Sequence, residues 1–324
     1  MSKKDDAIRE MNRLGGRGEP FLFVIDFDME APEVLTPSGA SDRGILYDIG
    51  GATNARLQQA RETPLTFRKF PLPFADYRLA FDAVQAELGN GNSYLLNLTF
   101  PTRIETDLGL GEIFHAGPAK YRLLFPGRFV CFSPERFVRI SDGVISSCPM
   151  KGTIDASAPD AEAAIMENPK ELAEHTTIVD LIRNDLNMVS TGVKVERFRY
   201  IDRISTNRGE ILQVSSLITG RLPGDYRERI GTILFSMLPA GSVTGAPKKK
   251  TVEIIRRVEA GPRGFYTGIA GYFDGTTLDS GVMIRFIERT NEGMYYRSGG
   301  GITAQSDAES EYDEMVGKVY VPAF

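Results

Sequence analysis

The sequence has few of the side chains that most often carry out nucleophilic and metal chemistry. Its 324 residues include two cysteines and two histidines. With only His115 and His175 available, no Ser-His-Asp arrangement stands out. No spacing of cysteine and histidine is typical of a zinc site. These shortages argue against a catalytic triad and against bound zinc.

Long hydrophobic runs are also missing. The first apolar run, from Phe21 to Ile25, is too short for the core of a signal peptide. No stretch approaches the roughly 20 apolar residues that span a bilayer. Cys131 and Cys148 lie in strand-like segments, where small buried thiols are more common than reactive ones. We therefore expect no membrane partner and a reduced, cytoplasmic location.

An excess of positive charge is absent too. The formal net charge is −5 and the pI is near 5.4, whereas a nucleic-acid partner would require a basic face. With 42% hydrophobic and 25% charged residues, the chain can bury a large core. Composition alone allows one large domain or two. No low-complexity linker and no repeat of fixed period divides the chain.

The residue pattern predicts an α+β fold. Short strand-like runs fill residues 1–75, and a helix is expected from about Tyr77 to Leu88. Closely spaced strands between residues 121 and 148, with a tight turn at Asp142-Gly143, predict an antiparallel meander. Later strands are expected at residues 193–200, 210–218, 266–273, 281–288 and 294–297, and helices at 227–238 and 247–258. Because strands and helices do not strictly alternate, large antiparallel sheets covered by helices are favoured.

Capping signals mark two more helices. Asn168, Pro169 and Glu171 form a capping-box arrangement at the start of one helix. Ser306 with Glu309 forms a second arrangement of this kind, which we expect to open the last helix.

Each of these two helices carries a pair of glutamates three residues apart, Glu171 with Glu174 and Glu311 with Glu314. Residues at this spacing share a helical face, so each pair projects two carboxylates in one direction. Four half-buried carboxylates would repel one another, and a hard divalent cation such as Mg²⁺ would relieve the repulsion. Most pairs at this spacing are exposed, however, and Glu171 could serve only as a cap. Spacing alone does not decide between a metal site, exposed glutamate pairs and, for Glu171, a helix cap.

Lys151 lies between Pro149 and Gly152 at the end of a strand, where the backbone geometry is fixed. A lysine in a turn is normally solvated. If Lys151 were desolvated, its pKa would fall and it could act as a nucleophile or base. Glu135 lies one hairpin earlier and could face the same cavity, or it could form a surface ion pair.

Two backbone segments and one arginine could bind anions. Residues 239–248 form a loop that runs into a helix N-terminus, although the P-loop pattern is absent and nucleotide binding is weakly supported. Gly299-Gly300-Gly301 offers a second bare backbone. Arg285 lies in an otherwise apolar strand and requires a carboxylate partner, either internal or bound. Together these features suit a small polyanionic substrate.

Several motifs follow one another in a distinctive order from about Tyr94 to the C-terminus. They occupy residues 149–153, 171–175, 180–185, 241–248, 263–268, 278–280, 284–285, 299–302 and 311–318. In this combination the sequence resembles the chorismate-utilising enzymes. The resemblance implies a layered β/α sandwich like that of anthranilate synthase component I, in a single domain. Residues 91–324 would form its motif-bearing core and residues 1–90 a shortened N-terminal part.

Within this family, Lys151 looks like the lysine of the type that forms aminodeoxychorismate, because anthranilate and isochorismate synthases generally carry alanine there. The resemblance implies that Lys151 attacks C2 of chorismate and expels the C4 hydroxyl, and that ammonia then adds at C4 as the lysine leaves. The product would be 4-amino-4-deoxychorismate, a precursor of 4-aminobenzoate and folate. Glu135 matches the family's acid/base glutamate. Anthranilate synthase component I, isochorismate synthase and a non-catalytic chorismate-binding subunit remain alternatives.

The resemblance also implies ligands for the site. The four glutamates of the two helical pairs would hold Mg²⁺ against the ring carboxylate. The enolpyruvyl carboxylate would be bound by Arg285 and Tyr266. The remaining substrate-binding residues implied are Thr244, Gly245, Gly268, Gly299 and Gly301, with Lys248 and Lys318 as charge partners.

Three departures from the family pattern affect these expectations. Gln213 replaces a histidine that many members have, so Glu135 would have to carry more of the proton transfer. No tryptophan-binding motif is found, so feedback inhibition by tryptophan is not expected. No Gly-x-Cys-x-Gly nucleophile elbow occurs, and ammonia is therefore expected from a separate glutamine amidotransferase subunit or from solution.

Overall fold

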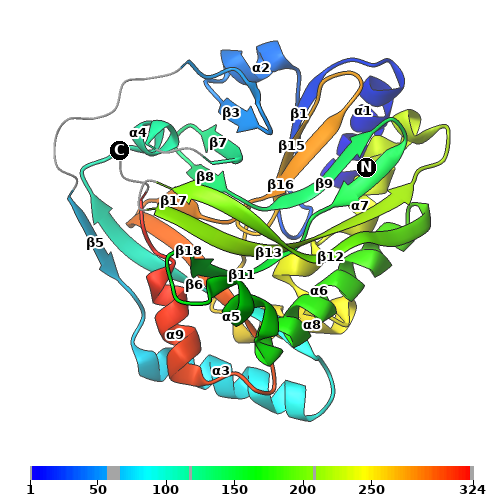
Figure 1. The fold of residues 1–324 in the computed structure, drawn as a ribbon. Coiled ribbons are helices and arrows are strands. Elements are labelled where there is room, and N and C mark those ends of the chain that lie inside the picture. Colours follow the sequence, from blue (N-terminus) through cyan, green and yellow to red (C-terminus); the bar gives the residue numbers. More distant parts are fainter. Residues whose placement is uncertain (1, 57–65, 117–118, 207–208, 322–324) are drawn as a thin grey trace.

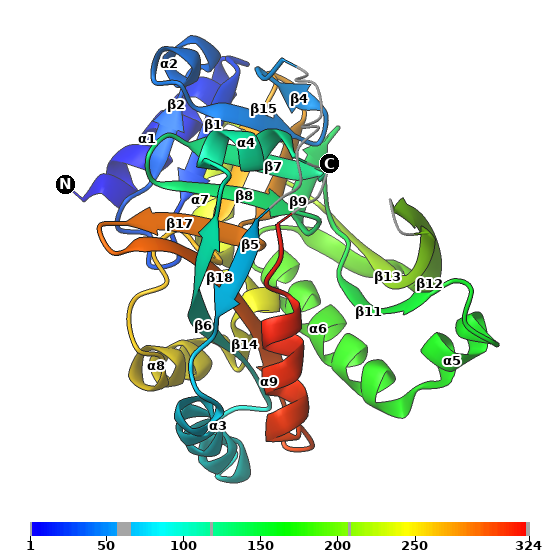
Figure 2. The ribbon, with the colours of Figure 1, turned by 90° about the vertical axis from the view of Figure 1, so that its left-hand side faces the viewer.

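The computed structural model describes residues 2–56, 66–116, 119–206 and 209–321. Two antiparallel nine-stranded sheets pack face to face at its centre, and helices cover their outer faces (Figures 1 and 2). This arrangement confirms the predicted α+β sandwich of large antiparallel sheets and helices. The single-domain interpretation stays a prediction.

The first sheet combines strands from both halves of the chain. In order across the sheet they are β11 (Met150–Asp155), β13 (Gly209–Arg221), β10 (Val144–Ser147), β9 (Arg136–Ser141), β16 (Leu278–Val282), β15 (Ile269–Phe273), β1 (Phe21–Ile25) and β2 (Glu33–Leu35), with β12 (Thr191–Thr206) paired to β13.

The second sheet is equally mixed in sequence. Its order is β14 (Gly245–Ala246), β6 (Leu95–Thr106), β18 (Gly293–Ile302), β17 (Phe286–Thr290), β8 (Phe129–Ser133), β7 (Tyr121–Phe125), β3 (Leu46–Ile49) and β4 (Ala52–Thr53), with β5 (Phe67–Phe70) paired to β6.

The helices cover these sheets on their outer sides (Figure 2). They are α1 (Lys3–Gly16), α2 (Pro37–Asp42), α3 (Phe74–Gly89), α4 (Leu110–His115), α5 (Ala161–Glu167), α6 (Pro169–Asn187), α7 (Ile230–Met237), α8 (Lys248–Val258) and α9 (Ala308–Gly317), with 3₁₀ turns η1 (Tyr226–Arg229) and η2 (Gly241–Val243). None of the helices in the described ranges is both long enough and apolar enough to cross a membrane.

The continuous apolar run of β1 is explained by burial on both faces. Leu22 and Val24 pack between the two sheets, with residues of β3, β7 and β8. The alternate residues Phe21, Phe23 and Ile25 pack on the other face, beneath α1, α6 and α7. A strand covered on both sides has no solvent face, which removes the usual alternation of polar and apolar residues.

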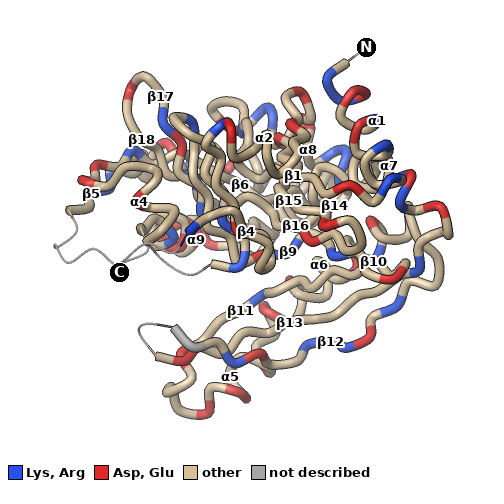
Figure 3. The backbone as a smooth tube through the Cα atoms, turned by 90° about the horizontal axis from the view of Figure 1, so that it is seen from above, with Lys and Arg blue, Asp and Glu red and all other residues tan. Residues whose placement is uncertain are grey.

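The outer strand β12 shows how the first sheet is protected at its edge. It pairs only with β13 in the described part of the chain, and its register shifts at several points. Charges of both signs follow it, including the ion pair between Lys194 and Glu196 (Figure 3). Bulges and charged side chains of this kind oppose pairing with another chain.

The predicted meander between residues 121 and 148 is wrong in one respect that shapes the site. β7 and β8 pair in the second sheet, whereas β9 and β10 pair in the first. The chain crosses from one sheet to the other at Pro134-Glu135, where proline has no N–H to continue a ladder. Asp142 and Gly143 do form the predicted tight turn, with φ of 51° and 73°.

The strand expected over residues 281–288 is likewise two strands in different sheets. β16 ends at Val282 and β17 begins at Phe286, and between them Arg285 has a φ of 51°. This second crossing lies beside the first, because Phe132 N donates to Arg285 O at 3.1 Å and Val282 N donates to Glu135 O at 3.1 Å. Arg285 therefore does not lie inside an apolar strand, and the two crossings bring Glu135 and Arg285 to the junction of the sheets.

Of the two predicted helix caps, one is confirmed and one is wrong, and helix α1 was not predicted. Asn168 caps α6 as predicted, because its Oδ1 accepts from Glu171 N at 3.2 Å. The cap of α9 is Asp307 rather than Ser306, whose hydroxyl donates instead to Glu311. Sequence analysis did not predict α1, although its buried residues recur at helical spacing and Ser2 forms a capping box with Asp5.

The two cysteines differ in their surroundings. Cys131 is buried in β8, and burial raises the pKa of its thiol to about 12. Cys148 is half-buried just after β10, with its sulfur 3.3 Å from the hydroxyl of Tyr200.

Candidate active site

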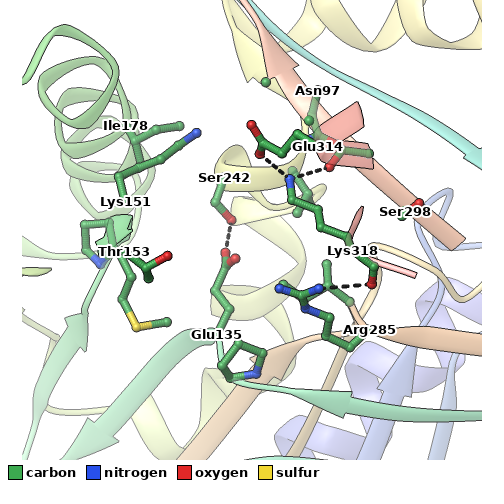
Figure 4. A pocket seen from close by; sticks show the side chains of 18 of the residues that line it. Asn97, Glu135, Lys151, Thr153, Ile178, Ser242, Arg285, Ser298, Glu314 and Lys318 are labelled. Atoms are coloured by element: carbon green, nitrogen blue, oxygen red, sulfur yellow. Dashed lines mark hydrogen bonds and ion pairs between the residues drawn. The ribbon is translucent and has the colours of Figure 1, made fainter. Parts of the chain in front are cut away.

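A cavity of about 260 Å³ lies where the two sheet crossings meet α6 and α9 (Figure 4). Lys151 and Ile178 enter it from one side, and Glu314 and Lys318 enter it from the opposite side. Glu135 lies between these walls. Among the expected site residues, those that line this cavity are Glu135, Lys151, Tyr266, Arg285, Gly299, Gly301, Glu314 and Lys318.

Lys151 is directed into the cavity by a bulged strand. The register of β11 shifts between Lys151 and Thr153, and Gly152 has a φ of 78°, which favours glycine. A Cβ at Gly152 would also lie 3.0 Å from a carboxylate oxygen of Glu171. Gly152 therefore bends the strand and also leaves room for Glu171 of α6.

The charge state of Lys151 differs from the expected one. Its Nζ lies 3.0 Å from Glu174 Oε2. Burial lowers the pKa of this ammonium, but Glu174, together with Glu314 and Glu171, more than offsets that effect and the pKa lies above its usual value. Lys151 is thus a partly buried ammonium ion, with 28% of its side chain exposed, and the expectation of a lowered pKa is wrong.

For Glu135, burial affects the pKa more than the neighbouring groups do. Burial raises the pKa of its carboxyl group, whereas a hydrogen bond from Ser242 and the charge of Lys151 act to lower it. The net direction is upward. A carboxyl group with a raised pKa in a cavity can hold a proton nearer to neutral pH and can both donate and accept it.

The four paired glutamates line an adjoining space of about 570 Å³. Lys151, Arg285 and Lys318 line both spaces, so the two spaces lie side by side. The spacing in α6 and α9 therefore does place two pairs of carboxylates around one hollow. Glu311 is the most buried of the four, with 4% of its surface exposed, and it accepts a hydrogen bond from Ser306 Oγ at 2.8 Å.

These four carboxylates offer the oxygen ligands that Mg²⁺ prefers. Two of them are occupied by ammonium groups, Glu174 by Lys151 and Glu314 by Lys318 at 2.7 Å. In the described ranges, no three acidic, imidazole or thiol groups converge as a preformed metal site. The carboxylate oxygens thus fit a hard divalent cation, while in this structure Lys151 and Lys318 neutralise two of the four glutamates.

The main cavity also carries an arginine and a tyrosine. Arg285 Nη1 donates to Lys318 O at 3.1 Å, and its guanidinium lies over the ring of Tyr320 at 5.2 Å. No carboxylate is paired with Arg285 among the described residues. Tyr266 is 3% exposed, and burial raises the pKa of its phenol. An uncompensated guanidinium beside a neutral phenol can bind an incoming carboxylate.

Four expected substrate-binding residues, Thr244, Gly245, Gly268 and Lys248, line neither space in the described structure. The Lys248 ammonium lies 2.5 Å from Asp185 Oδ1 and 2.8 Å from Met237 O, so it joins α8 to α6. Gly268 faces β1 closely, because an added Cβ would lie 2.1 Å from Ile25 O.

Thr244 and Gly245 belong to the loop between η2 and α8. Thr244 is fully buried, and its carbonyl accepts from Asn97 N at 2.8 Å. Arg263 supports the same loop by donating to Val243 O and to Asn97 O, each at 2.6 Å, while paired with buried Glu259. These residues form the packing behind the cavity rather than its surface.

The side chains that line the cavity and that sequence reasoning did not single out include Ser242 and Tyr296. Ser242 lies within the motif at residues 241–248, so that motif was the available signal. Tyr296 lies three residues before Gly299 on β18, and nothing in the local sequence separates it from an ordinary strand tyrosine. Gln213, noted as a departure, also lines the cavity.

The family model for chorismate binding enzymes matches residues 37–323. This match covers most of the chain and both walls of the cavity. The chain therefore belongs to the chorismate-binding enzyme family.

Individual relatives refine this assignment. An uncharacterized PabA-like protein of Haemophilus influenzae is 51% identical over 97% of this chain and 96% of its own length. Aminodeoxychorismate synthase component 1 of Salmonella typhimurium is 34% identical over 75% of this chain, and the match spans 56% of that protein. The menaquinone-specific isochorismate synthase of Escherichia coli has the same fold, with a TM-score of 0.73 and 17% identity over 98% of this chain and 81% of that one.

Proposed function

We propose that this protein aminates chorismate at C4 with ammonia and forms 4-amino-4-deoxychorismate and water. The observation that carries the proposal is the position of Lys151, whose amine enters the same cavity as the raised-pKa carboxyl group of Glu135. A nucleophile and an acid/base group facing one substrate space are what a two-step displacement requires.

In the first step, neutral Lys151 forms a bond to C2, the ring double bonds shift, and the C4–O bond breaks. Glu135 protonates the departing hydroxyl, which leaves as water. In the second step, ammonia forms a bond to C4, the double bonds shift back, and the C2–N bond to Lys151 breaks. Glu135 then accepts the proton that the new ammonium group releases.

Lys151 must lose its proton before it can attack. Glu174, at 3.0 Å, is the group in position to accept that proton, and it would return the proton to the amine after the C2–N bond breaks. Because the pKa of the Lys151 ammonium lies above its usual value, removing its proton adds to the activation barrier of the first step.

Mg²⁺ is the proposed cofactor, and Glu171, Glu174, Glu311 and Glu314 are the residues that would hold it. When bound, the ion supplies positive charge for the ring carboxylate. The chain's own contribution at the opposite end is Arg285 with Tyr266, which would bind the enolpyruvyl carboxylate. The backbone of Gly299 and Gly301 would position the ring between these two ends.

A product assay tests the proposal. Purified protein is incubated with chorismate, Mg²⁺ and ammonium, and the product is identified by mass and by its conversion to 4-aminobenzoate with a separate lyase. Accumulation of aminodeoxychorismate is expected. Anthranilate or isochorismate as the product would place the protein in a sibling reaction, and the absence of turnover with intact chorismate binding would indicate a binding subunit.

The source of ammonia is a second part of the proposal. We propose that a separate glutamine amidotransferase subunit delivers it. The purified chain should then use ammonium but not glutamine, and addition of a matching amidotransferase should restore turnover with glutamine. Turnover of glutamine by the chain alone would contradict this.

A further inference from the structure

Tyr296 carries a buried hydroxyl for which the described residues provide no hydrogen-bond acceptor. The residue has no exposed surface, and the polar group beside its hydroxyl is the Arg285 guanidinium, which can only donate. A buried hydroxyl without an acceptor destabilises a protein, so such a group requires a reason. Tyr296 is also one of the residues that line the main cavity.

The ring of Tyr296 is fixed by its surroundings. β18 pairs with β6 and β17 on its two sides, which places Tyr296 opposite Thr102 and Ile287. Its ring packs edge-on against Phe132 at 6.3 Å between centroids. Because the ring is held in this packing, the hydroxyl occupies a defined position and would lose little entropy on binding a ligand.

The hydroxyl lies on the arginine side of the cavity. Burial raises the pKa of the phenol, and the charge of the nearby Arg285 guanidinium and a hydrogen bond from it act in the opposite direction. The net direction is upward, so the phenol is neutral and can donate its proton to an acceptor. Arg285, which has no carboxylate partner in the described residues, and Tyr296, whose hydroxyl has no acceptor, thus share one end of the cavity.

We propose that the Tyr296 hydroxyl and the Arg285 guanidinium together bind one carboxylate of the substrate, with the phenol as an additional hydrogen-bond donor. This inference rests on the proposed function, and the carboxylate is the one on the enolpyruvyl side chain of chorismate. The carboxylate would accept a hydrogen bond from both donors at once, and it would supply the acceptor that the buried phenol lacks. Tyr296 is therefore a substrate-binding residue.

The test compares Tyr296→Phe with Tyr295→Phe. The first change removes only the buried hydroxyl and keeps the ring. The control removes the hydroxyl of the preceding residue on the same strand. That hydroxyl lies on the surface and donates to Glu292 at 3.3 Å. Each protein is titrated calorimetrically with chorismate and Mg²⁺ in the absence of ammonium.

For Tyr296→Phe, we expect the dissociation constant for chorismate to rise on the order of tenfold or more, because a hydrogen bond to a charged group is lost. The melting temperature of the ligand-free protein should stay unchanged or rise, since an unsatisfied buried group is removed. Tyr295→Phe should change neither quantity. Unchanged affinity in Tyr296→Phe, or a loss of affinity accompanied by a large fall in melting temperature, would overturn the inference.

Two stable probes make this test independent of turnover. 3-(Carboxymethoxy)benzoate carries both carboxylates in an arrangement similar to that of chorismate, and 3-methoxybenzoate lacks the side-chain carboxylate. Wild-type protein should prefer the first probe, and Tyr296→Phe should reduce that preference. If the preference persists unchanged in Tyr296→Phe while amination proceeds, the inference fails and the proposed function stands. If the preference depends on Tyr296 but no aminodeoxychorismate forms, the proposed function fails instead.

Discussion

The two ends of the cavity carry opposite charge and are built from different kinds of structure. Glutamates of α6 and α9 surround one end, and each pair comes from a single helical face. Arg285, Tyr266 and Tyr296 line the main cavity, and Arg285, which also borders the acidic space, lies where the chain passes from one sheet to the other. The acidic end suits a cation, and the arginine end suits an anion. We propose that a substrate with carboxylates at two separated positions binds between these groups. Lys151 enters the cavity from the side opposite Glu314 and Lys318, and Glu135 lies between them (Figure 4).

The largest effect is expected for the proposed nucleophile, Lys151. Lys151→Ala should reduce the rate of aminodeoxychorismate formation by about 10³-fold or more, because the nucleophile is removed. Calorimetric binding of chorismate should change much less. Lys250→Ala, which removes an exposed lysine paired with Glu253, is the matched control and should keep full activity. Undiminished turnover in Lys151→Ala would reject the covalent role.

Glu135→Gln should reduce kcat by roughly 10²- to 10³-fold, since the amide keeps the shape but cannot transfer the proton. The comparison with Lys151→Ala separates proton transfer from bond formation. Single-turnover kinetics with the Gln variant should show slow loss of the C4 hydroxyl. Glu105→Gln, at an exposed ion pair on β6, serves as the control. Equal activity in both variants would remove Glu135 from the mechanism.

Arg285→Lys tests the anion-binding end alone. Lysine keeps the charge but loses the planar pair of donors, so the dissociation constant for chorismate should rise by about 10- to 100-fold. The affinity for Mg²⁺ at the acidic end, measured by calorimetry, should be nearly unchanged. Arg289→Lys changes an exposed arginine of β17 and should leave both affinities as they are. A parallel loss of Mg²⁺ binding in Arg285→Lys would show that the two ends do not act separately.

The smallest effect is expected for Ser242→Ala, and it is a shift in pH dependence. The hydrogen bond from Ser242 lowers the pKa of Glu135, so its removal should move that pKa further upward. The limb of the kcat profile that reports Glu135 should therefore move to higher pH, by about one unit or less. Ser236→Ala, on the exposed side of α7, should leave the profile in place. A shift to lower pH would contradict the assigned hydrogen bond.

The acidic end was predictable because helical spacing is local. Glu171 and Glu174, like Glu311 and Glu314, share a face whatever the rest of the fold does. The same local rules predicted the cap at Asn168 and the turn at Asp142-Gly143. They failed at Ser306, where Asp307 one residue later is also an acceptable cap.

The arginine end could not be predicted from local pattern. The periodicity of residues 281–288 cannot indicate that Val282 and Phe286 belong to different sheets. The position of Tyr296 beside Arg285 depends on the pairing of β18 with β17, and the lack of an acceptor for its hydroxyl among the described residues is a property of the packed interior. For the same reason Lys248, which has a suitable charge in a suitable motif, joins two helices instead of lining the cavity.

The sequence by itself determined the family, the helical glutamate pairs and the presence of a lysine between Pro149 and Gly152, because these depend on residue identity and short spacing. Only the tertiary structure decided that Lys151 is held as an ammonium by Glu174, that Glu135 lines the same cavity, and that no carboxylate of the described residues pairs with Arg285. Charge state and accessibility depend on which distant residues surround a group, and that neighbourhood is set by the folding of two sheets over one another.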